Sequence, residues 1–220
     1  MSETQPKPVA LEAREAGEDG RRFSPSVARN REAIRDAFAE HVAREGRVLE
    51  IASGTGEHGA FLTEALKGLD WTYSDVDAAS RDSQAAWVTA MEHDRLHGPL
   101  VLDASLADWG EAEAERPWDV VVSINMVHIA PMSAVEGLFA GAGRLLKPGG
   151  RLFLYGPFGR DGIMASSNAR FSEDLKRRDM EWGVRDLDME LLPLASLADL
   201  ILQEIIAMPA NNLAVVFERT

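Results

Sequence analysis

Residues 48–59, VLEIASGTGEHG, decide the fold of this chain. The apolar run from Val48 to Ile51 predicts a short buried strand. Ser53-Gly54-Thr55-Gly56 predicts a tight turn, because glycine tolerates positive φ and lets a ligand approach the backbone closely. A helix follows from Glu57, with its apolar side chains on one face. Together these elements predict a nucleotide site, because the free N–H groups and the dipole of the helix N-terminus point at the ligand.

Two classes of cofactor compete for this loop. The spacing Gly54-x-Gly56-x-x-Gly59 matches the dinucleotide fingerprint, in which glycines receive a pyrophosphate. Glu50, however, stands at the strand end, four residues before Gly54, where a carboxylate disfavours phosphate. The order of acid, turn and Gly-x-Gly resembles motif I of the class I S-adenosylmethionine (SAM) methyltransferases, whose ligand is a cation without phosphate. We therefore favour SAM over a dinucleotide and assign the following residues to cofactor binding: Glu50, Ala52, Ser53, Gly54 and Gly56.

Length and composition predict one α/β domain without nucleic-acid partners. The 220 residues suffice for one such domain with a full core and are few for two. A net charge of −13, from 23 basic and 36 acidic residues, repels phosphate backbones. There is no cysteine, so we expect neither disulfides nor a cysteine-ligated metal, and we assign no metal site. Without a membrane-length apolar run or a signal-peptide core, we expect a cytoplasmic protein, either a monomer or a homodimer.

The N-terminal region divides into a tail and a helix. Residues 1–22 are polar and charged and predict a flexible tail, so the domain is expected over residues 23–220. Ser24-Pro25 suits the start of a helix, which carries apolar residues at helical spacing. This helix is either a lid packed on the sheet or a segment that closes over the amino-acid end of the cofactor. In the second reading, the closing residues are Ser24, Arg29 and Asn30.

Two further predicted strands end in carboxylates. The strand 71–74 ends at Asp75, which can hold both ribose hydroxyls of an adenosine ligand in either cofactor class. We prefer Asp75 to Asp77 because it comes first after the strand. The strand 99–102 ends at Asp103-Ala104, and the Asp103 carboxylate either accepts from the adenine amino group or caps a following helix.

The run 118–125, WDVVVSIN, is the clearest central strand, because its near-continuous apolar character suits a parallel strand covered on both faces. The carboxyl ends of such strands line the ligand crevice, so Asn125 is a cofactor candidate and His128 a catalytic one. The next strand, 151–155, ends at Tyr155, a second catalytic candidate.

The order of elements predicts the architecture. Strands that alternate with helices imply a doubly wound, Rossmann-like sheet with right-handed crossovers. At the end of the chain, predicted strands 200–208 and 213–218 are joined by the turn-rich tetrapeptide Pro-Ala-Asn-Asn. They predict a C-terminal antiparallel hairpin on an otherwise parallel, seven-stranded sheet.

Residues 156–187 are a long polar insertion with aromatic residues and weak periodicity. An insertion of this length beyond a strand's carboxyl end predicts a binding lid. Within it, Lys176-Arg177-Arg178 is either a solvated helix face or a clamp for an acidic substrate. We assign these residues to substrate binding: Asn168, Arg170, Phe171, Trp182 and Arg185, together with Asn211.

Three longer stretches resemble the class I SAM-dependent methyltransferases: VLEIASGTGEHG, WDVVVSINMVHIAP and LLKPGGRLFLYGPF. A narrower resemblance spans residues 23–218 and is to the uncharacterised DUF938, or methyltransferase-like 26, family. Its motifs are FSPSVARN, EIASGTGEH, NMVHIAP, GLFAGAGRLLKPGG, EWGVRD and MPANNL. The resemblance implies a seven-stranded sheet and SAM as cofactor, and it supplies no methyl acceptor. Ala52 departs from the wider class, which usually has glycine there.

The resemblance implies methyl transfer, an in-line displacement in which a protein mainly aligns the reactants and excludes water. His128 is the candidate general base, or else it fixes its loop by hydrogen bonding. Residues 125–128, NMVH, differ from the Asn/Asp-Pro-Pro-aromatic motif of DNA amino-methylases, which favours a small-molecule or protein acceptor. The alternatives are a SAM-binding regulator or scaffold without catalysis, and an NAD(P)-dependent oxidoreductase.

Overall fold

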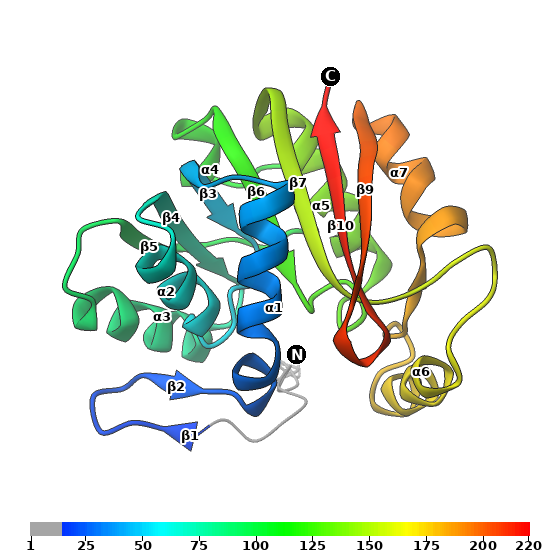
Figure 1. The fold of residues 1–220 in the computed structure, drawn as a ribbon, viewed down its shortest axis with the longest axis horizontal. Coiled ribbons are helices and arrows are strands. Elements are labelled where there is room, and N and C mark those ends of the chain that lie inside the picture. The colour runs from blue at the N-terminus through cyan, green and yellow to red at the C-terminus, as the bar shows by residue number, and fades with distance from the viewer. Residues whose placement is uncertain (1–14) are drawn as a thin grey trace, which may run out of the picture.

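A mixed β-sheet forms the centre of the structure, a computed structural model that describes residues 15–220 (Figure 1). Its main path runs in the order β5-β4-β3-β6-β7-β10-β9. The strands are β3 (Glu45–Glu50), β4 (Gly68–Asp75), β5 (Leu96–Val101), β6 (Trp118–Ile124), β7 (Leu146–Gly159), β9 (Leu200–Met208) and β10 (Asn212–Arg219). Strands β3 to β7 pair in parallel, and β10 lies antiparallel between β7 and β9. This order confirms the predicted doubly wound sheet and its C-terminal antiparallel hairpin.

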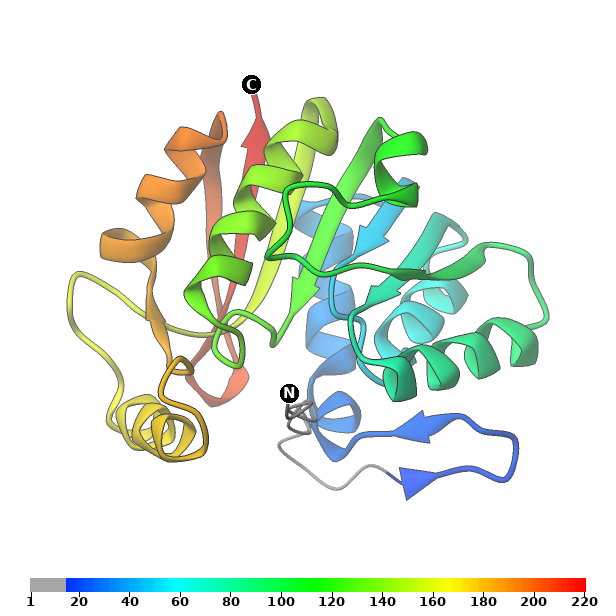
Figure 2. The same cartoon turned by 180° about the vertical axis from the view of Figure 1, so that it is seen from behind.

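Helices cover both faces of the sheet (Figures 1 and 2). One face carries α1 (Pro25–His41), α2 (Glu57–Ala65) and α3 (Ala78–Ala90), which pack on a core that includes Phe38 and Trp71. The other carries α4 (Glu111–Ala114), α5 (Met132–Leu145), a π-helical turn η1 (Leu187–Leu191) and α7 (Leu192–Leu197), around Phe139 and Phe217. The segment 187–197 is thus a π turn followed by an α-helix.

The central strand β6 shows why the sheet has two cores. Val120 and Val122 belong to the core beneath α1, whereas Val121 belongs to the core beneath α5. Successive side chains of a strand point to opposite faces, so a continuous apolar run fills both layers.

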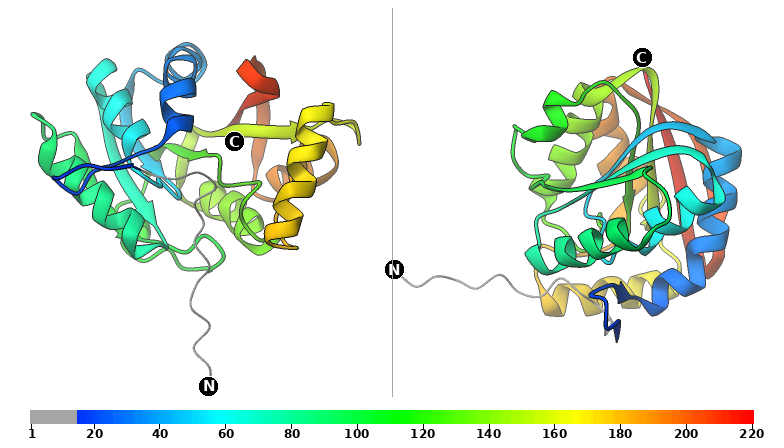
Figure 3. Two further views of the ribbon diagram at one scale, coloured as in Figure 1. Left: turned by 90° about the horizontal axis from the view of Figure 1, so that it is seen from below. Right: turned by 90° about the vertical axis from the view of Figure 1, so that its left-hand side faces the viewer.

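The carboxyl ends of the parallel strands meet at one edge, seen from below in Figure 3. A short hairpin of β1 (Glu15–Ala16) and β2 (Arg22–Phe23) flanks this edge on one side, and α6 (Ser166–Arg178) flanks it on the other. Residues 1–14 of the predicted tail lie outside the described residues. Residues 15–22 differ from the prediction, because Arg21 stacks over Trp87 at 4.7 Å and the Arg22 amide donates to Ser83 Oγ (2.9 Å).

The insertion contains more regular structure than its weak periodicity predicted. α6 buries Asn168, Ser172 and Leu175, and two of these are polar, which hides the apolar stripe from sequence. The chain then returns to pair β8 (Arg185–Asp186) with the end of β7. The Gly183 amide donates to the His128 carbonyl (3.0 Å), so the insertion is tied to the loop after β6. No helix among the described residues is long and apolar enough to cross a membrane.

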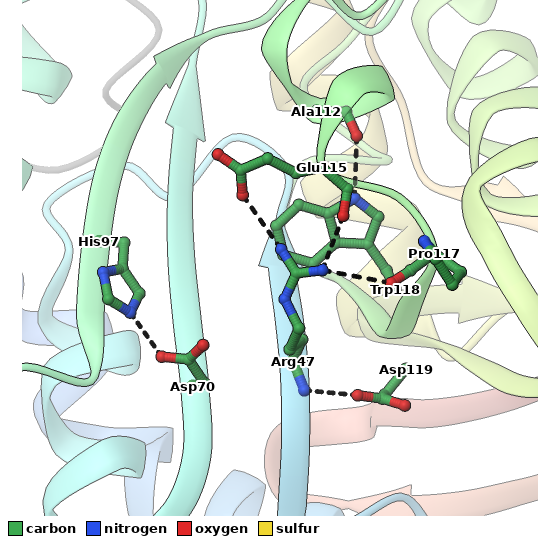
Figure 4. A network of polar contacts seen from close by, with 8 residues as sticks. All are labelled: Arg47, Asp70, His97, Ala112, Glu115, Pro117, Trp118 and Asp119. Carbon is green, nitrogen blue, oxygen red and sulfur yellow. Dashed lines mark hydrogen bonds and ion pairs between the residues drawn. The ribbon is translucent and has the colours of Figure 1, made fainter.

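A polar network closes the opposite, amino-terminal edge of the sheet (Figure 4). The Arg47 guanidinium lies 4.5 Å from the Trp118 ring and donates to the Glu115 carbonyl (2.6 Å), while the Arg47 amide donates to Asp119 (2.7 Å). Trp118 Nε1 in turn donates to the Ala112 carbonyl (3.0 Å). The polar groups at that edge are therefore paired with one another, and their role is to hold the fold together.

Gly59 sets how closely α2 approaches β4. A Cβ there would lie 2.4 Å from Tyr73 Cε1 and 2.6 Å from Trp71 Nε1. We expect Gly59→Ala to lower the free energy of unfolding by about 1–3 kcal/mol, the usual cost of overpacking a core. Urea denaturation measures this value. Glu64→Ala, at an exposed position of the same helix, is the control, and equal values for the two variants would contradict the packing role.

Candidate functional site

A cavity of about 860 Å³ lies at the carboxyl edge of the sheet, between the start of α1 and α6. Its floor comes from the ends of β3, β4, β5 and β6, so residues far apart in sequence share one wall. Small-molecule sites usually occupy about 300–1,000 Å³. The cavity lining includes these predicted residues: Arg29, Glu50, Ala52, Ser53, Gly54, Asp75, Asp103, Ala104, Asn125, His128, Asn168, Phe171 and Trp182.

The other predicted site residues lie outside this lining. Tyr155 is 3% exposed in the core beneath α1, and Arg170 is exposed on α6. The Gly56 carbonyl accepts from the Tyr73 hydroxyl on the side away from the cavity, and the Asn211 carbonyl accepts from Asn168 (2.8 Å). Asn30 and Arg185 contact lining residues, as described below. A sequence pattern gives the strand end but not the direction of each side chain beyond it.

Asp75 holds the glycine loop in shape. Its Oδ2 accepts from the Gly54 amide (2.9 Å), and its Oδ1 accepts from the Asp77 amide (2.9 Å). The carboxylate is 6% exposed and lines the cavity at the end of β4. Gly54 has a φ of 60°, a conformation that glycine adopts without strain. One side chain thus joins the ends of β3 and β4 and faces the ligand space.

Ala52 has the left-handed backbone that glycine would favour. Its φ is 57°, which costs an L-residue on the order of 1–2 kcal/mol. This conformation explains why glycine is usual at this position in the class I SAM methyltransferases that the chain resembles. The alanine methyl group also narrows the space for a cofactor. Asn125, at the end of β6, also has a positive φ (63°), and asparagine tolerates this region better than most residues.

Asp77 and Asp103 both cap local structure. Asp77 is the N-cap of α3, and its Oδ2 accepts from the Ser80 amide (2.8 Å). Asp103 Oδ1 accepts from the Ser105 amide (2.9 Å) and hydroxyl (2.7 Å). The alternative of a helix directly after Asp103 is wrong, because the chain makes a turn there and the next helix begins at Glu111.

Glu50 is a buried acid in the cavity wall. Its side chain is 1% exposed, and its Oε2 accepts from Trp71 Nε1 (3.0 Å). The pKa of Glu50 is raised to about 8, mainly by burial. The nearby Asp75 carboxylate also raises this pKa, whereas the hydrogen bonds with Trp71 and Ser53 lower it. A cation in the cavity would favour the charged form of Glu50.

The start of α1 is tied to the same loop. Glu57, in the first turn of α2, accepts from the Ser24 amide (2.5 Å) and from Thr55 Oγ1 (3.3 Å). Farther along α1, Ile34 and Phe38 are buried in the core, whereas Ser24 and Ser26 line the cavity. The helix therefore packs on the sheet, as one reading of its sequence expects, and its start also forms part of the cavity wall.

His128 lines the cavity from the loop after β6, and its ring lies 5.5 Å from the Phe171 ring of α6. Its Nδ1 is buried without a hydrogen-bond partner among the described residues. Burial lowers the pKa of His128 to about 4, and the Arg185 charge adds to this effect. The sequence does not show this enclosure of the ring.

The lid arginines occupy different positions from those predicted. Arg185 Nη2 donates to the carbonyls of Ala130 (3.0 Å) and Glu181 (2.5 Å), so it braces two loops behind the cavity. Arg178, from the basic run of α6, is exposed to solvent and also lines the cavity. The lid contributes mainly uncharged side chains to the wall: Asn168, Phe171, Leu175 and Trp182.

Sequence reasoning missed His58, which lines the cavity from the first turn of α2. It is 7% exposed, and its Nε2 lies 3.0 Å from Asn30 Oδ1 of α1. Burial lowers the pKa of His58 to about 4, so the ring is neutral at pH 7. The sequence signal that could have identified His58 as a cavity residue is its position shortly after the Gly-x-Gly turn.

Comparison with known proteins adds a family and a fold. A family model described as "Protein of unknown function (DUF938)" matches residues 21–219. Over 116 residues the chain is 28% identical to the highly reducing polyketide synthase acrA of Aspergillus aculeatus, a match that covers 52% of this chain and 5% of that protein. The chain therefore spans a small part of that curated relative's length.

Solved structures share the fold at low identity. An O-methyltransferase family protein from Burkholderia thailandensis matches with a TM-score of 0.70 and 16% identity, over 88% of this chain and 60% of that chain. Human N-acetylserotonin methyltransferase, solved in complex with SAM, matches with a TM-score of 0.69 and 14% identity, over 88% and 52%. These likenesses confirm the class I methyltransferase fold.

The raised pKa of Glu50 makes stability depend on pH. The folded state keeps this proton up to about pH 8, whereas an unfolded glutamic acid loses it near its ordinary pKa of 4.5. Glu50 therefore lowers stability as pH rises between these values. Glu50→Gln removes this effect and can still accept from Trp71. Between pH 6 and pH 8 we expect it to gain about 2 kcal/mol of unfolding free energy relative to the unmodified protein.

Urea denaturation at the two pH values measures the change. Glu64→Gln, on the exposed side of α2, should show no such difference. A pH-independent offset for Glu50→Gln would show that Glu50 is charged in the folded protein at pH 6.

Proposed function

The chain belongs to the DUF938 family, and we propose that it is a SAM-dependent methyltransferase that transfers a methyl group to a small-molecule acceptor. The domain that does so spans residues 23–220, with residues 156–187 as its lid. The structural neighbours support this cofactor and this kind of acceptor, since one is an O-methyltransferase family protein and another is N-acetylserotonin methyltransferase in complex with SAM.

The observation that carries the proposal is the use of the Gly54 amide. In a dinucleotide site, glycine-loop amides receive a pyrophosphate. Here the Gly54 amide donates to the Asp75 carboxylate (2.9 Å), and two further acids, Glu50 and Asp103, line the same half of the cavity. This half fits a cationic nucleoside without phosphate and disfavours the NAD(P)-dependent alternative.

Residues at successive strand ends bind different parts of the cofactor. Asp75 binds the ribose hydroxyls with the carboxylate edge that faces the cavity. Asp103 and Ala104, at the end of β5, border the adenine, and the Asp103 oxygen not used by Ser105 is available to its amino group. The ends of β3 and β6 and the start of α1 enclose the amino-acid part, with Arg29 and Asn125 in the wall and Asn30 in contact with it through His58.

The cavity continues beyond the cofactor half, which supports an enzyme over a SAM-binding regulator. Asn168, Phe171 and Trp182 of the lid line this second half together with His128 and Asn125, and the Phe171 ring packs against the His128 ring. An acceptor bound there would lie next to the methyl end of the cofactor. The walls exclude water and hold the acceptor in line with the methyl group.

SAM bound here would supply a methyl group on a sulfonium, which is activated for transfer to an acceptor atom with the thioether sulfur as leaving group. His128 takes the acceptor's proton where the acceptor arrives protonated. Because its pKa is about 4, the ring is neutral and able to accept at physiological pH. Tyr155 lies behind this wall in the core and supports it through Asn30, to which its hydroxyl is hydrogen-bonded.

Asp75→Ala should weaken SAM binding by about 1.5–3 kcal/mol, the range for hydrogen bonds to a charged group. Asp77→Ala is the matched control, because Asp77 caps α3 through the Ser80 amide. We expect it to lower the unfolding free energy by about 1 kcal/mol and to change affinity little. Calorimetric titration with SAM measures both, and equal losses of affinity would refute the assignment of the ribose to Asp75.

Turnover with labelled SAM against a metabolite extract tests the proposed activity and yields an acceptor. On that acceptor, His128→Gln should lower kcat by about 10²–10⁴ and leave the affinity for S-adenosylhomocysteine unchanged. The acid limb of the unmodified protein's pH–rate profile should fall near pH 4, where His128 becomes protonated.

His97→Gln is the control for this variant, because His97 pairs with Asp70 on the outer part of the sheet (2.5 Å). An unchanged kcat for His128→Gln would leave His128 only the role of fixing its loop. Absence of labelled product from every extract would favour the regulator over the enzyme.

A further inference from the structure

His58 is a buried, titratable cavity residue without a role in the proposed methyl transfer. It lies in the first turn of α2, two residues after Gly56, and shares the cavity wall with Glu50 and Ser53. Its exposed fraction is 7%, so its polar atoms must be satisfied within the fold or by a ligand.

The hydrogen bond to Asn30 fixes which ring nitrogen carries the proton. His58 Nε2 lies 3.0 Å from Asn30 Oδ1, and because an amide oxygen only accepts, Nε2 donates. The Asn30 amide is oriented by a second contact, since its side chain is also hydrogen-bonded to the Tyr155 hydroxyl of β7. Asn30 thus sets the tautomer of His58 from a neighbouring helix.

The remaining nitrogen, Nδ1, is then an acceptor only. The ring is neutral at pH 7, because burial lowers the pKa of His58 to about 4. No residue in the described part of the chain hydrogen-bonds Nδ1, and, unlike Nδ1 of His128, it is not sealed from solvent. Because His58 is a wall residue, we take the accessible side of Nδ1 to face the ligand space.

The position of His58 selects one part of the ligand. The predicted adenine neighbours, Asp103 and Ala104, follow β5, which lies at one edge of the sheet. His58 instead lies beside the end of β3 and contacts α1, which packs toward β9 and β10 on the other side. The cofactor part at this end is the amino acid.

The acidic groups around His58 favour a cation. Glu50 of β3 and Asp75 of β4 line the same half of the cavity, and Glu57 precedes His58 on α2. Arg29 of α1 is the basic residue of this half. A carboxylate ligand needs donors, which Nδ1 cannot offer, whereas an ammonium group needs acceptors.

We propose that His58 Nδ1 accepts a hydrogen bond from the α-ammonium group of the cofactor, with Asn30 as the positioning residue that holds the ring in the accepting tautomer. This inference rests on the proposed function, because it takes SAM as the ligand. It assigns recognition of the amino-acid end to a side-chain pair that bridges α1 and α2.

Two ligands distinguish recognition of the ammonium group from a general effect of His58 on ligand binding. S-adenosylhomocysteine carries the ammonium group, whereas 5′-methylthioadenosine has the adenosine part without the amino acid. His58→Leu should weaken S-adenosylhomocysteine binding at least tenfold, as expected for a hydrogen bond to a charged group. It should change 5′-methylthioadenosine binding less than twofold. Calorimetry at pH 7.5 measures both, and thermal unfolding checks that the variant is folded.

Two further variants test the chemistry of the pair. His58→Asn places an amide oxygen near the position of Nδ1 and should restore part of the lost affinity. Asn30→Leu removes the acceptor that keeps the proton on Nε2, frees the ring to carry it on Nδ1 and should weaken S-adenosylhomocysteine binding alone.

Equal losses for the two ligands in His58→Leu, or no loss for either, would overturn the inference and leave the proposed function standing. If the unmodified protein bound neither ligand, the proposed function would fail and the inference with it.

Discussion

The hydrogen bond from the Gly54 amide to the Asp75 carboxylate is the contact on which the site depends. It joins the ends of β3 and β4 at 2.9 Å and closes the glycine loop around an internal anion. A helix N-terminus next to free glycine amides would attract a phosphate. Because this loop already holds a carboxylate, the same strand–turn–helix architecture becomes a site that suits a cation.

The second constraint is the enclosure of the cavity between α1 and α6. Glu50, His58 and His128 all lie in this wall. Burial raises the pKa of Glu50 and lowers the pKa values of the two histidines, so it favours the neutral form of each. When the site is empty, these three side chains present hydrogen-bonding atoms to the ligand space without a charge of their own. A bound cation then shifts Glu50 toward its charged form, so binding of the ligand and ionisation of the wall support each other.

The fold was predictable because its signals are local: the apolar run of β6, the glycine turn after β3, and the two strands that end the chain. The strand ends were placed well enough to bring Glu50, Asp75, Asp103 and Asn125 into one cavity. The side-chain directions were not predictable. Arg185 turns toward two backbone carbonyls, and His58 turns inward from a helix whose first turn gave no apolar periodicity. These orientations follow from packing between distant segments, which one sequence does not display.

The most direct measurement of the central claim is calorimetric titration of the protein with S-adenosylhomocysteine and, in parallel, with NADH. The account predicts saturable one-site binding of S-adenosylhomocysteine and no binding of NADH, because the glycine loop is closed around Asp75 and its cavity half is acidic. Saturable binding of NADH without binding of S-adenosylhomocysteine would contradict the account, and would mean that the Gly54 amide is released from Asp75 to receive a pyrophosphate.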